Sequence, residues 1–417
     1  MRSSLLIAVL MCVVSFPAMA SDESGAAQLP PTLNTPGNSQ LAKLTASGDS
    51  PSGGLGGSVA VSGDIVVVGA PNTPIGHNRG QGAVYVFRKP ADGWSNATQI
   101  AVLTASDGNI DDSLGGAVAI SGDTIVAGAY VANIYVGAVY VFVKPAGGWS
   151  NMTQTAKLTS SDLLANANLG WSVAIDHDTI VAGAPGLVWD GLPCRVYVYV
   201  RPANGWTDTA ETAEFAVAPD GSGFGASVAV HDDTIVVSAT GLSRGNYVFV
   251  RPKEGWRTTS KYTALLSGSN GICCSVVAMN GQTVVAAVGG KERTVYVFSK
   301  PVGGWASSTE TARLNGAGGS GERLNSVSIN SSGTAILAGT LTGILAKSGS
   351  AYLYLEPEGG WVTASRSDEE LRASDETARD EFGGSVGMGE HYAVVGSWGA
   401  QVVGKQASGA AYVFGNE

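Results

Sequence analysis

The stretch LGGAVAISGDTIVAGAY, residues 114–130, decides how this chain folds. Two apolar runs rich in β-branched residues flank Ser121-Gly122-Asp123, a short polar turn of the kind that joins two strands of a hairpin. The stretch recurs six more times, as LGGSVAVSGDIVVVGAP from Leu55, LGWSVAIDHDTIVAGAP from Leu169, FGASVAVHDDTIVVSAT from Phe224, ICCSVVAMNGQTVVAAV from Ile272, LNSVSINSSGTAILAGT from Leu324 and FGGSVGMGEHYAVVGSW from Phe382. Seven copies of one hairpin predict a repeat architecture.

Each hairpin is followed by material for two further strands. A third strand reads GAVYVF at 82–87 and 137–142, and a fourth reads TQTAKLT at 153–159 or ETAEFAV at 211–217. Between them six repeats carry Pro-x-x-Gly-Trp, which ends at Trp94, Trp149, Trp206, Trp256, Trp305 and Trp361, a spacing of 49 to 57 residues. A period near 50 without helical periodicity predicts one four-stranded antiparallel sheet per repeat. The fold class is therefore all-β, a seven-bladed β-propeller.

The two ends of the repeat region complete each other. The last repeat stops after its third strand at Phe414, and SQLAKLT at 39–45 matches the missing fourth strand. We expect this N-terminal strand to complete the seventh blade and close the ring, which removes an exposed sheet edge. Residues 1–20 resemble a secretory signal peptide, 21–38 a flexible linker, and 39–417 form the propeller. We expect an exported protein, periplasmic or extracellular.

Composition excludes several classes of protein. The 58 glycines and 16 prolines have no three-residue period, which excludes collagen, and 44% hydrophobic residues with only 14% charged residues exclude a disordered chain. The net charge of −10 argues against nucleic-acid binding, and after the signal no apolar run is long enough for membrane insertion. Beyond the signal, Cys194 and the adjacent Cys273 and Cys274 are expected to be small buried side chains, with a strained disulfide at 273 and 274 or a reactive thiol as alternatives.

The repeats resemble the FG-GAP family, whose best-known members form the propeller of integrin α-subunit heads. The resemblance rests on Phe-Gly at 224 and 382, Leu-Gly at 55, 114 and 169, and Gly-Ala-Pro at 69 and 183. It implies a secreted or surface propeller engaged in recognition rather than catalysis. Family members that bind calcium hold it between strands one and two, and here those turns are too short to surround an ion that takes about 6–8 oxygen ligands. We expect no cofactor, with calcium the one candidate.

A second acidic set precedes strand one in two repeats. Asp111 and Asp112, with Asp107 upstream, correspond to Asp380 and Glu381, with Asp375 upstream. These carboxylates are expected to accept hydrogen bonds from backbone amides of a tight loop. The alternative is a weak site for a divalent ion.

Catalytic machinery is not evident in the sequence. Three of the four histidines, His177, His231 and His391, fall at the strand one to strand two turn of different blades, and we expect these repeated positions to lie too far apart to converge. No nucleophile elbow, HExxH or Walker motif is present. The repeated Gly-Trp favours a structural turn over a row of sugar-stacking platforms. The alternative is a carbohydrate-active hydrolase or lyase with carboxylates gathered at the channel mouth.

Binding is expected on one face of the ring. The turns joining strands one to two and three to four are nearly constant and share a face, called here the constant-turn face. The other connections vary and form the variable-loop face, where binding residues tend to accumulate on a rigid scaffold. Candidate binding residues there are His77, Arg79, Tyr135, Trp189, Asp190, Arg244 and Trp398. We expect a non-enzymatic module that binds a protein or glycan partner, or else a structural repeat protein without a dedicated ligand.

Overall fold

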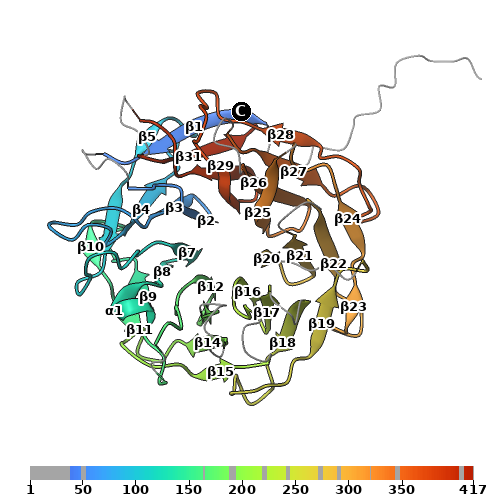
Figure 1. The fold of residues 1–417 in the computed structure, drawn as a ribbon, viewed down its shortest axis with the longest axis horizontal. Coiled ribbons are helices and arrows are strands. Elements are labelled where there is room, and N and C mark those ends of the chain that lie inside the picture. The colour runs from blue at the N-terminus through green and yellow to red at the C-terminus, as the bar shows by residue number, and fades with distance from the viewer. Residues whose placement is uncertain are drawn as a thin grey trace, which may run out of the picture. The chain divides into compact units, whose positions relative to one another are not determined.

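Seven antiparallel sheets surround a common axis in this computed structural model, which confirms the seven-bladed β-propeller (Figure 1). The structure describes residues 38–47, 53–162, 165–186, 194–217, 223–240, 245–270, 276–288, 293–319, 321–342, 348–402 and 408–416. Residues Asn34–Glu417 group as one compact unit. Cys273 and Cys274 lie outside the described residues, as do the expected signal peptide and all but the last residue of the expected linker.

Blades are numbered in chain order, and the strands of each run from the axis outward. Blade 1 contains β2 (Ser58–Ser62), β3 (Ile65–Ala70), β4 (Ala83–Arg88) and β6 (Ala101–Thr104). Blade 2 contains β7 (Ala117–Ser121), β8 (Thr124–Ala129), β9 (Ala138–Val143) and β11 (Ala156–Leu158). Blade 3 contains β12 (Ser172–Asp176), β13 (Thr179–Ala184), β14 (Arg195–Val200) and β15 (Ala213–Phe215). Blade 4 contains β16 (Val228–His231), β17 (Thr234–Ala239), β18 (Gly245–Val250) and β19 (Ala264–Ser267).

The other three blades have the same order. Blade 5 contains β20 (Val276–Met279), β21 (Thr283–Ala287), β22 (Val295–Ser299) and β24 (Ala312–Leu314). Blade 6 contains β25 (Glu322–Ile329), β26 (Ala335–Thr342), β27 (Ala351–Leu355) and β28 (Glu369–Leu371). Blade 7 contains β29 (Phe382–Met388), β30 (Tyr392–Ser397), β31 (Ala410–Gly415) and β1 (Ser39–Thr45). Three short strands, β5 (Ala97–Thr98), β10 (Met152–Thr153) and β23 (Ser308–Thr309), and one short helical turn, α1 (Ala132–Tyr135), complete the set.

The N-terminal strand closes the ring as expected. β1 pairs antiparallel with β31, with Leu44 opposite Ala411, although these strands stand at opposite ends of the chain. The Nζ of Lys43 lies 2.6 Å from Oδ2 of Asp375, and the hydroxyl of Tyr412 in β31 donates to Oδ1 of the same carboxylate at 2.9 Å. The three side chains thus join β1, β31 and the loop that leads into blade 7.

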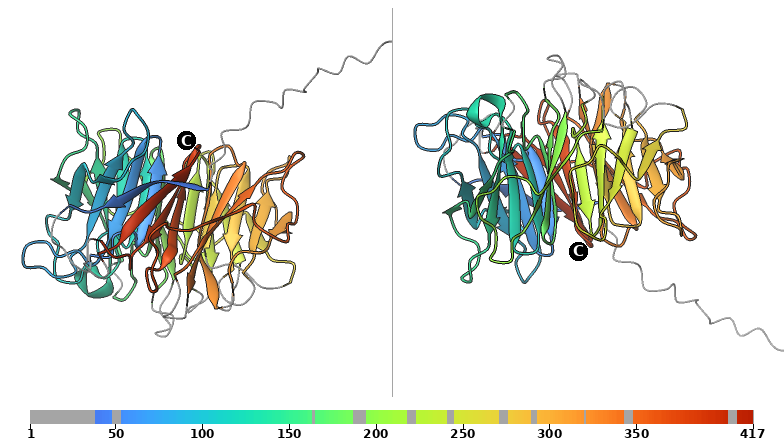
Figure 2. Two further views of the ribbon diagram at one scale, coloured as in Figure 1. Left: turned by 90° about the horizontal axis from the view of Figure 1, so that it is seen from above. Right: turned by 90° about the horizontal axis from the view of Figure 1, so that it is seen from below.

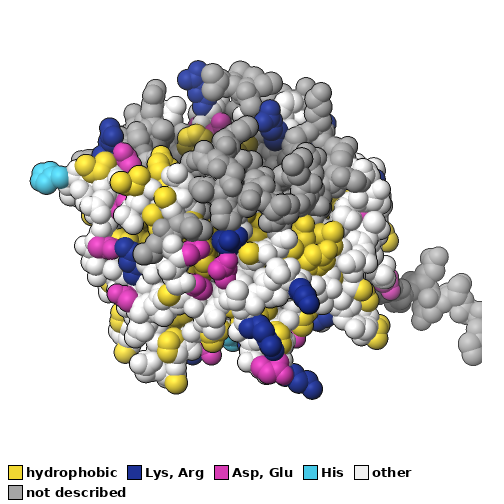
Figure 3. Space-filling view, turned by 60° about the horizontal axis from the view of Figure 1, so that its bottom comes forward, with side chains coloured by type: hydrophobic (Ala, Val, Ile, Leu, Met, Phe, Trp, Pro, Cys, Tyr) yellow, Lys and Arg dark blue, Asp and Glu magenta, His cyan; other side chains and the backbone are white. Residues whose placement is uncertain are grey.

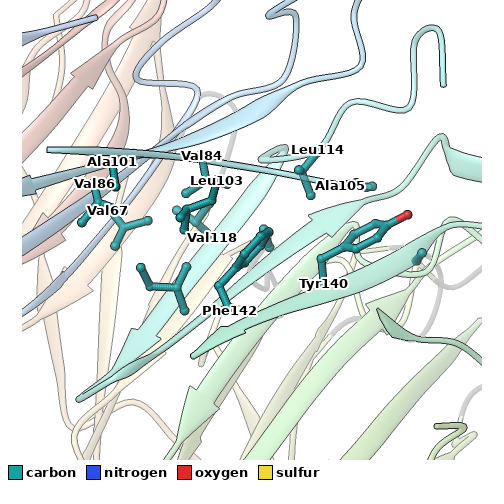
Figure 4. Close-up of a cluster of buried hydrophobic side chains, with 14 of the residues drawn as sticks. Val67, Val84, Val86, Ala101, Leu103, Ala105, Leu114, Val118, Tyr140 and Phe142 are labelled. Atoms are coloured by element: carbon teal, nitrogen blue, oxygen red, sulfur yellow. The ribbon is translucent and has the colours of Figure 1, made fainter. Parts of the chain in front are cut away.

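Hydrophobic cores lie between the blades. The second and third strands are buried almost throughout, because neighbouring blades cover both faces, and their sequences are continuous apolar runs for the same reason. Seven clusters are found among the described residues, one for each interface between neighbouring blades. Figure 4 shows the first, in which Val84 and Leu103 of blade 1 face Val118, Tyr140 and Phe142 of blade 2.

The repeated glycines allow the blades to approach each other closely. A Cβ placed on Gly128 of blade 2 would lie 2.8 Å from the carbonyl carbon of Gly170 in blade 3, closer than real side-chain contacts. Gly170 itself has φ of +87°, a conformation that favours glycine. The same backbone contact joins Gly69 to Gly115, Gly183 to Gly225, Gly339 to Gly383 and Gly396 to Gly56. At these five interfaces the glycine of Leu-Gly or Phe-Gly therefore meets the glycine in the second strand of the blade before it.

The segment after each Gly-Trp holds the outermost strand of the preceding blade. Asn151 accepts a hydrogen bond from the amide of Val102 at 2.8 Å, and Gln154 accepts from the amide of Ser106 at 2.9 Å. In the other five repeats, too, the residue two positions after tryptophan accepts a backbone amide of the preceding blade with its side chain. The pairs, acceptor first, are Asn96 and Lys43, Asp208 and Lys157, Thr258 and Glu214, Ser307 and Leu265, and Thr363 and Arg313. The bond made by Gln154 also recurs, with a Gln or Glu side chain accepting a serine amide. The pairs, acceptor first, are Gln40 and Ser374, Gln99 and Ser47, Glu211 and Ser161, and Glu310 and Ser269. The next repeat therefore occupies part of each exposed sheet edge.

Candidate functional site

The variable-loop face carries the candidate residues that the structure describes. In the side views of Figure 2, α1 lies at this face of the ring. His77 and Arg79 are exposed in the loop after β3, and Arg79 approaches Oδ2 of Asp111 in the next blade at 3.4 Å. Both partners are largely exposed, so this ion pair contributes little to stability. Trp189, Asp190 and Arg244 lie outside the described residues.

Two of the four candidate metal-binding carboxylates serve their own loops. Asp112 is buried and accepts the amide of Asn109 at 2.7 Å, and burial raises the pKa of its carboxyl. Asp380 is also buried and accepts the amide of Thr377 at 2.6 Å. These contacts are the backbone hydrogen bonds that the sequence predicts for a tight loop.

The upstream carboxylates form charged contacts between blades. Lys157 lies 2.5 Å from Asp107, whose other oxygen accepts the Tyr140 hydroxyl at 3.0 Å, and Asp375 has the same contacts with Lys43 and Tyr412. Burial alone would raise the pKa of Asp107, but the hydrogen bonds from lysine and tyrosine hold it below the usual value. Both carboxylates are thus ionised and used in the scaffold.

Glu381 differs from the rest of the acidic set. Burial raises the pKa of its carboxyl, while a hydrogen bond involving the backbone of Thr342 opposes that shift. Trp398, 41% exposed, lies in the same part of blade 7, since a Cβ on Gly384 would contact both its indole and the carbonyl of Glu381. Glu381 is thus a half-buried carboxyl near an exposed indole ring.

An unusual turn follows β8 in blade 2. Within α1 the residues Asn133, Ile134 and Tyr135 have φ of 51°, 55° and 63°, so this turn is left-handed. A left-handed conformation costs an L-residue about 1–2 kcal/mol, and a β-branched residue such as isoleucine rarely adopts it. Burial of Ala132 and a hydrogen bond from the amide of Asn168 to the carbonyl of Tyr135 at 2.8 Å hold the turn in place. Ile134 is left 83% exposed and Tyr135 42% exposed.

An aromatic pair lies beside this turn. Trp171, 46% exposed, meets Tyr130 edge-on with ring centroids 5.0 Å apart, and its amide bonds the carbonyl of Asn168 at 3.0 Å. We call Tyr130, Ile134, Tyr135 and Trp171 the rim patch. Segments 130–137 and 165–171, which carry it, contain no Asp, Glu, Lys, Arg or His. The patch is therefore an uncharged, aromatic surface on an acidic protein.

Only Tyr135 of this patch was among the residues predicted to bind. Trp171 stands where three other repeats have the second glycine of Leu-Gly-Gly or Phe-Gly-Gly, and Tyr130 stands where two have the proline of Gly-Ala-Pro. The sequence signal for this patch is a large aromatic side chain at a position where other repeats have glycine or proline. Departures from the repeat, rather than the repeat itself, locate the candidate site.

Comparison with known proteins identifies the repeats. Four stretches match the family model of the FG-GAP repeat, residues 39–87, 97–142, 152–199 and 366–414. The chain carries FG-GAP repeats. Each matched stretch runs from the outermost strand of one blade, or just before it, to the third strand of the next. Blades 4 and 5 and the first three strands of blade 6 lie outside the matches; blades 4 and 5 have Ser238 and Ala286 at the close-contact position, whereas blade 6 has Gly339.

Structural comparison concerns the fold. The β-propeller domain of Cps50 (Swd1) from Myceliophteria thermophila resembles this chain with a TM-score of 0.52 and 12% identity, over 86% of this chain and 96% of that domain. No curated protein matches the sequence. In the described part of the chain, no helix combines the length and apolar character needed to cross a membrane.

The inner turns of blades 3 and 4 touch each other. Ligand atoms of Asp176, His177 and Asp232 lie within 4.8 Å of one another, because strand one is innermost and the ring is narrowest there. The residues that meet here are one histidine and two aspartates, whereas the prediction concerned the distance between the histidines themselves. One oxygen of Asp176 lies 2.8 Å from Nδ1 of His177, and the other accepts the amide of Asp232 at 2.6 Å. One oxygen is thus used within blade 3, and the other joins blade 3 to blade 4.

The repeated Gly-Trp is part of the scaffold. Trp206, Trp256, Trp305 and Trp361 are buried, and each belongs to an interblade core. Their ring faces are not available for stacking on sugars. Cys194 is likewise buried, with Sγ 3.0 Å from the carbonyl oxygen of Pro185, as expected of a small core side chain.

Proposed function

We propose that this protein is an exported, non-enzymatic module that binds a partner protein through the rim patch. The FG-GAP propeller fold supports a protein-binding or structural role. The observation that carries the proposal is the left-handed turn that presents Ile134 and Tyr135 to solvent. Strained backbone is concentrated at sites where the strain has a use, and this turn uses it to expose apolar surface.

The composition of the rim patch favours a protein partner. Cores of protein interfaces are enriched in aromatic residues and depleted of charge, and binding loops built from tyrosine, tryptophan and asparagine combine rigid contact area with adaptable hydrogen bonds. The side chain of Ile134 offers apolar contact area that a polypeptide surface can cover. By contrast, the charged side chains visible in Figure 3 are of both signs and form no single basic patch.

A glycan is the second candidate, supported by the exposed indole of Trp171 beside Tyr130. Aromatic faces can stack on sugar rings, and Asn133 and Asn166 add amides in the same two loops. The solvent-exposed isoleucine does not contribute to such a site, so the protein partner is preferred.

The variant Ile134→Asn tests the proposal with two opposing readouts. Asparagine tolerates a left-handed conformation, so the variant should be more stable than the wild type by about 1 kcal/mol. Loss of the apolar contact should weaken partner binding about tenfold or more. Affinity capture from cell-envelope and matrix extracts, followed by biolayer interferometry on the captured protein, measures binding, and a glycan array tests the second candidate.

Val302→Asn is the matched control, because Val302 is exposed on the constant-turn face. Binding should be unchanged in this control and reduced in Trp171→Ala. A variant at Ile134 that is more stable and binds with wild-type affinity would contradict the proposal.

A further inference from the structure

A pocket of about 510 Å³ lies on the constant-turn face, where blades 6, 7 and 1 meet. Its walls include Ser62, Asp64 and Lys89 of blade 1, Ser331 of blade 6, and Glu390 and Tyr392 of blade 7. Small-molecule sites in proteins have volumes of roughly 300–1,000 Å³, so this pocket is large enough for a ligand. It lies on the face opposite the rim patch and is independent of it.

Blade 1 uses its charged pair differently from the next two blades. In blade 2 Lys144 forms an ion pair with Asp123, and in blade 3 Arg201 lies 2.7 Å from Asp178. Lys89 and Asp64 occupy the same positions, and the amide of Lys89 donates to the carbonyl of Asp64 at 2.8 Å as in those blades.

Within the described residues, however, no ion pair joins the side chains of Lys89 and Asp64. Both line the pocket instead. The pocket thus holds one ammonium group and one carboxylate that do not neutralise each other.

The remaining walls are held in place by hydrogen bonds. The hydroxyl of Tyr392 donates to the carbonyl of Gly63 at 2.6 Å, which joins blade 7 to blade 1. Ser331 donates its hydroxyl to the carboxylate of Glu390, and the amide of Ser332 lies 3.4 Å from the same oxygen. Burial would raise the pKa of Glu390, but these hydrogen bonds hold it below the usual value. A second carboxylate is therefore fixed in its charged form at the pocket wall.

We propose that this pocket binds a short peptide by its two free termini. The terminal carboxylate pairs with Lys89, and the terminal ammonium lies between Asp64 and Glu390. A ligand with both charges satisfies both sides of the pocket, whereas an anion or a cation alone would leave one side unpaired. The Ser331 hydroxyl donates its proton to Glu390, so its oxygen can accept from a peptide amide, and Ser62, whose Oγ accepts the amide of Gly122 at 3.3 Å, can donate to a peptide carbonyl.

Triglycine is the probe, titrated into the full chain by isothermal calorimetry up to about 10 mM. We expect saturable binding that is lost when the peptide is N-acetylated and C-amidated. Lys89→Met and Asp64→Asn should each weaken binding about tenfold or more, since each removes a charged partner. Lys144→Met is the matched control, since it removes a lysine from the equivalent position outside the pocket, and it should bind triglycine as the wild type does.

Three results would overturn the proposal. They are equal affinity for the blocked peptide, binding of a neutral sugar such as glucose in place of triglycine, and absence of saturable binding. Thermal melts of the three variants confirm that each is folded, so that a loss of binding reports the pocket.

Discussion

Gly128 lies directly against the backbone of the next blade, so the effect of adding one methyl group at this position can be predicted. Gly128 has ordinary strand conformation, and its carbonyl accepts the amide of Gly115 at 3.0 Å, a hydrogen bond that does not require glycine at position 128. A Cβ there would lie 2.8 Å from the carbonyl carbon and 3.1 Å from the Cα of Gly170, with no flexible side chain that could move away. Gly128→Ala therefore acts through steric overlap between two backbones rather than through backbone strain.

The size of the effect follows from the interface that must open. Normal carbon–carbon contacts lie at about 3.5–4.0 Å, so blades 2 and 3 must separate locally by about 1 Å. A gap of that size forfeits a quarter to a half of the dispersion energy of the atoms it separates. The core beside it includes Val126, Leu169 and Tyr197, all fully buried. We expect Gly128→Ala to lower the free energy of unfolding by about 3 kcal/mol, at the upper end for overpacking.

Gly147→Ala is the matched control, a glycine-to-alanine change in the turn between the third and fourth strands of the same blade. A Cβ on Gly147 has no heavy atom within 4 Å, and its φ is not positive, so alanine there should be neutral or stabilise by up to about 1 kcal/mol. Guanidinium denaturation followed by tryptophan fluorescence gives the midpoint of each variant. If both alanines change the midpoint equally, the argument from blade contact is wrong.

Two further predictions concern repeated side chains. The indole of Trp361 donates to the carbonyl of Gly333 at 3.0 Å, whereas the equally buried Nε1 of Trp305 has no hydrogen-bond partner in the described residues. Trp361→Phe should therefore destabilise the protein by about 1 kcal/mol more than Trp305→Phe, as measured by denaturant unfolding of both variants under the same conditions. Burial would raise the pKa of Asp375, but Lys43 and Tyr412 hold this pKa below its usual value. The ionised carboxylate therefore stabilises the fold above the pKa that Asp375 has in the unfolded chain, near ~4, and this stabilisation is lost as the pH falls through the lower pKa of the folded protein. The stability difference between wild type and Asp375→Asn should accordingly narrow between about pH 5 and pH 2, and a difference independent of pH would refute the ion-pair role.

Much of the scaffold could be predicted because it repeats. The match between 39–45 and the fourth strands of other blades was enough to place β1 beside β31, since no other blade lacked that strand. The structural role of Gly-Trp was predictable for the same reason, because it stands in the same place in six units; four of these tryptophans are buried and two are half-buried. Repetition reports the contacts that every blade makes.

Contacts that depend on distance from the axis were harder to predict. Asp176 and Asp232 are 56 residues apart and belong to different blades, yet they touch because both lie at the inner end of a blade. The outer contact of Asn151 with Val102 spans two blades in the same way. Apart from Tyr135, the rim patch was not predicted, because Ile134 and Trp171 belong to no pattern that the repeats share. Their importance follows from local backbone conformation and exposure, which a period of 50 residues does not encode.

The pairing of β1 with β31 makes the order of synthesis matter. The first strand of the propeller cannot find its partner until the last has been made, so the ring closes through a contact between the most distant parts of the sequence. Such non-local pairing is slow, because loop entropy is lost before the contact compensates for it. Until then two sheet edges stay unpaired and open to association with other chains. Six blades can form and stack as the chain emerges. The seventh blade, joined by Lys43, Asp375 and Tyr412, forms last, and the rate at which it forms sets how long the chain remains prone to aggregation.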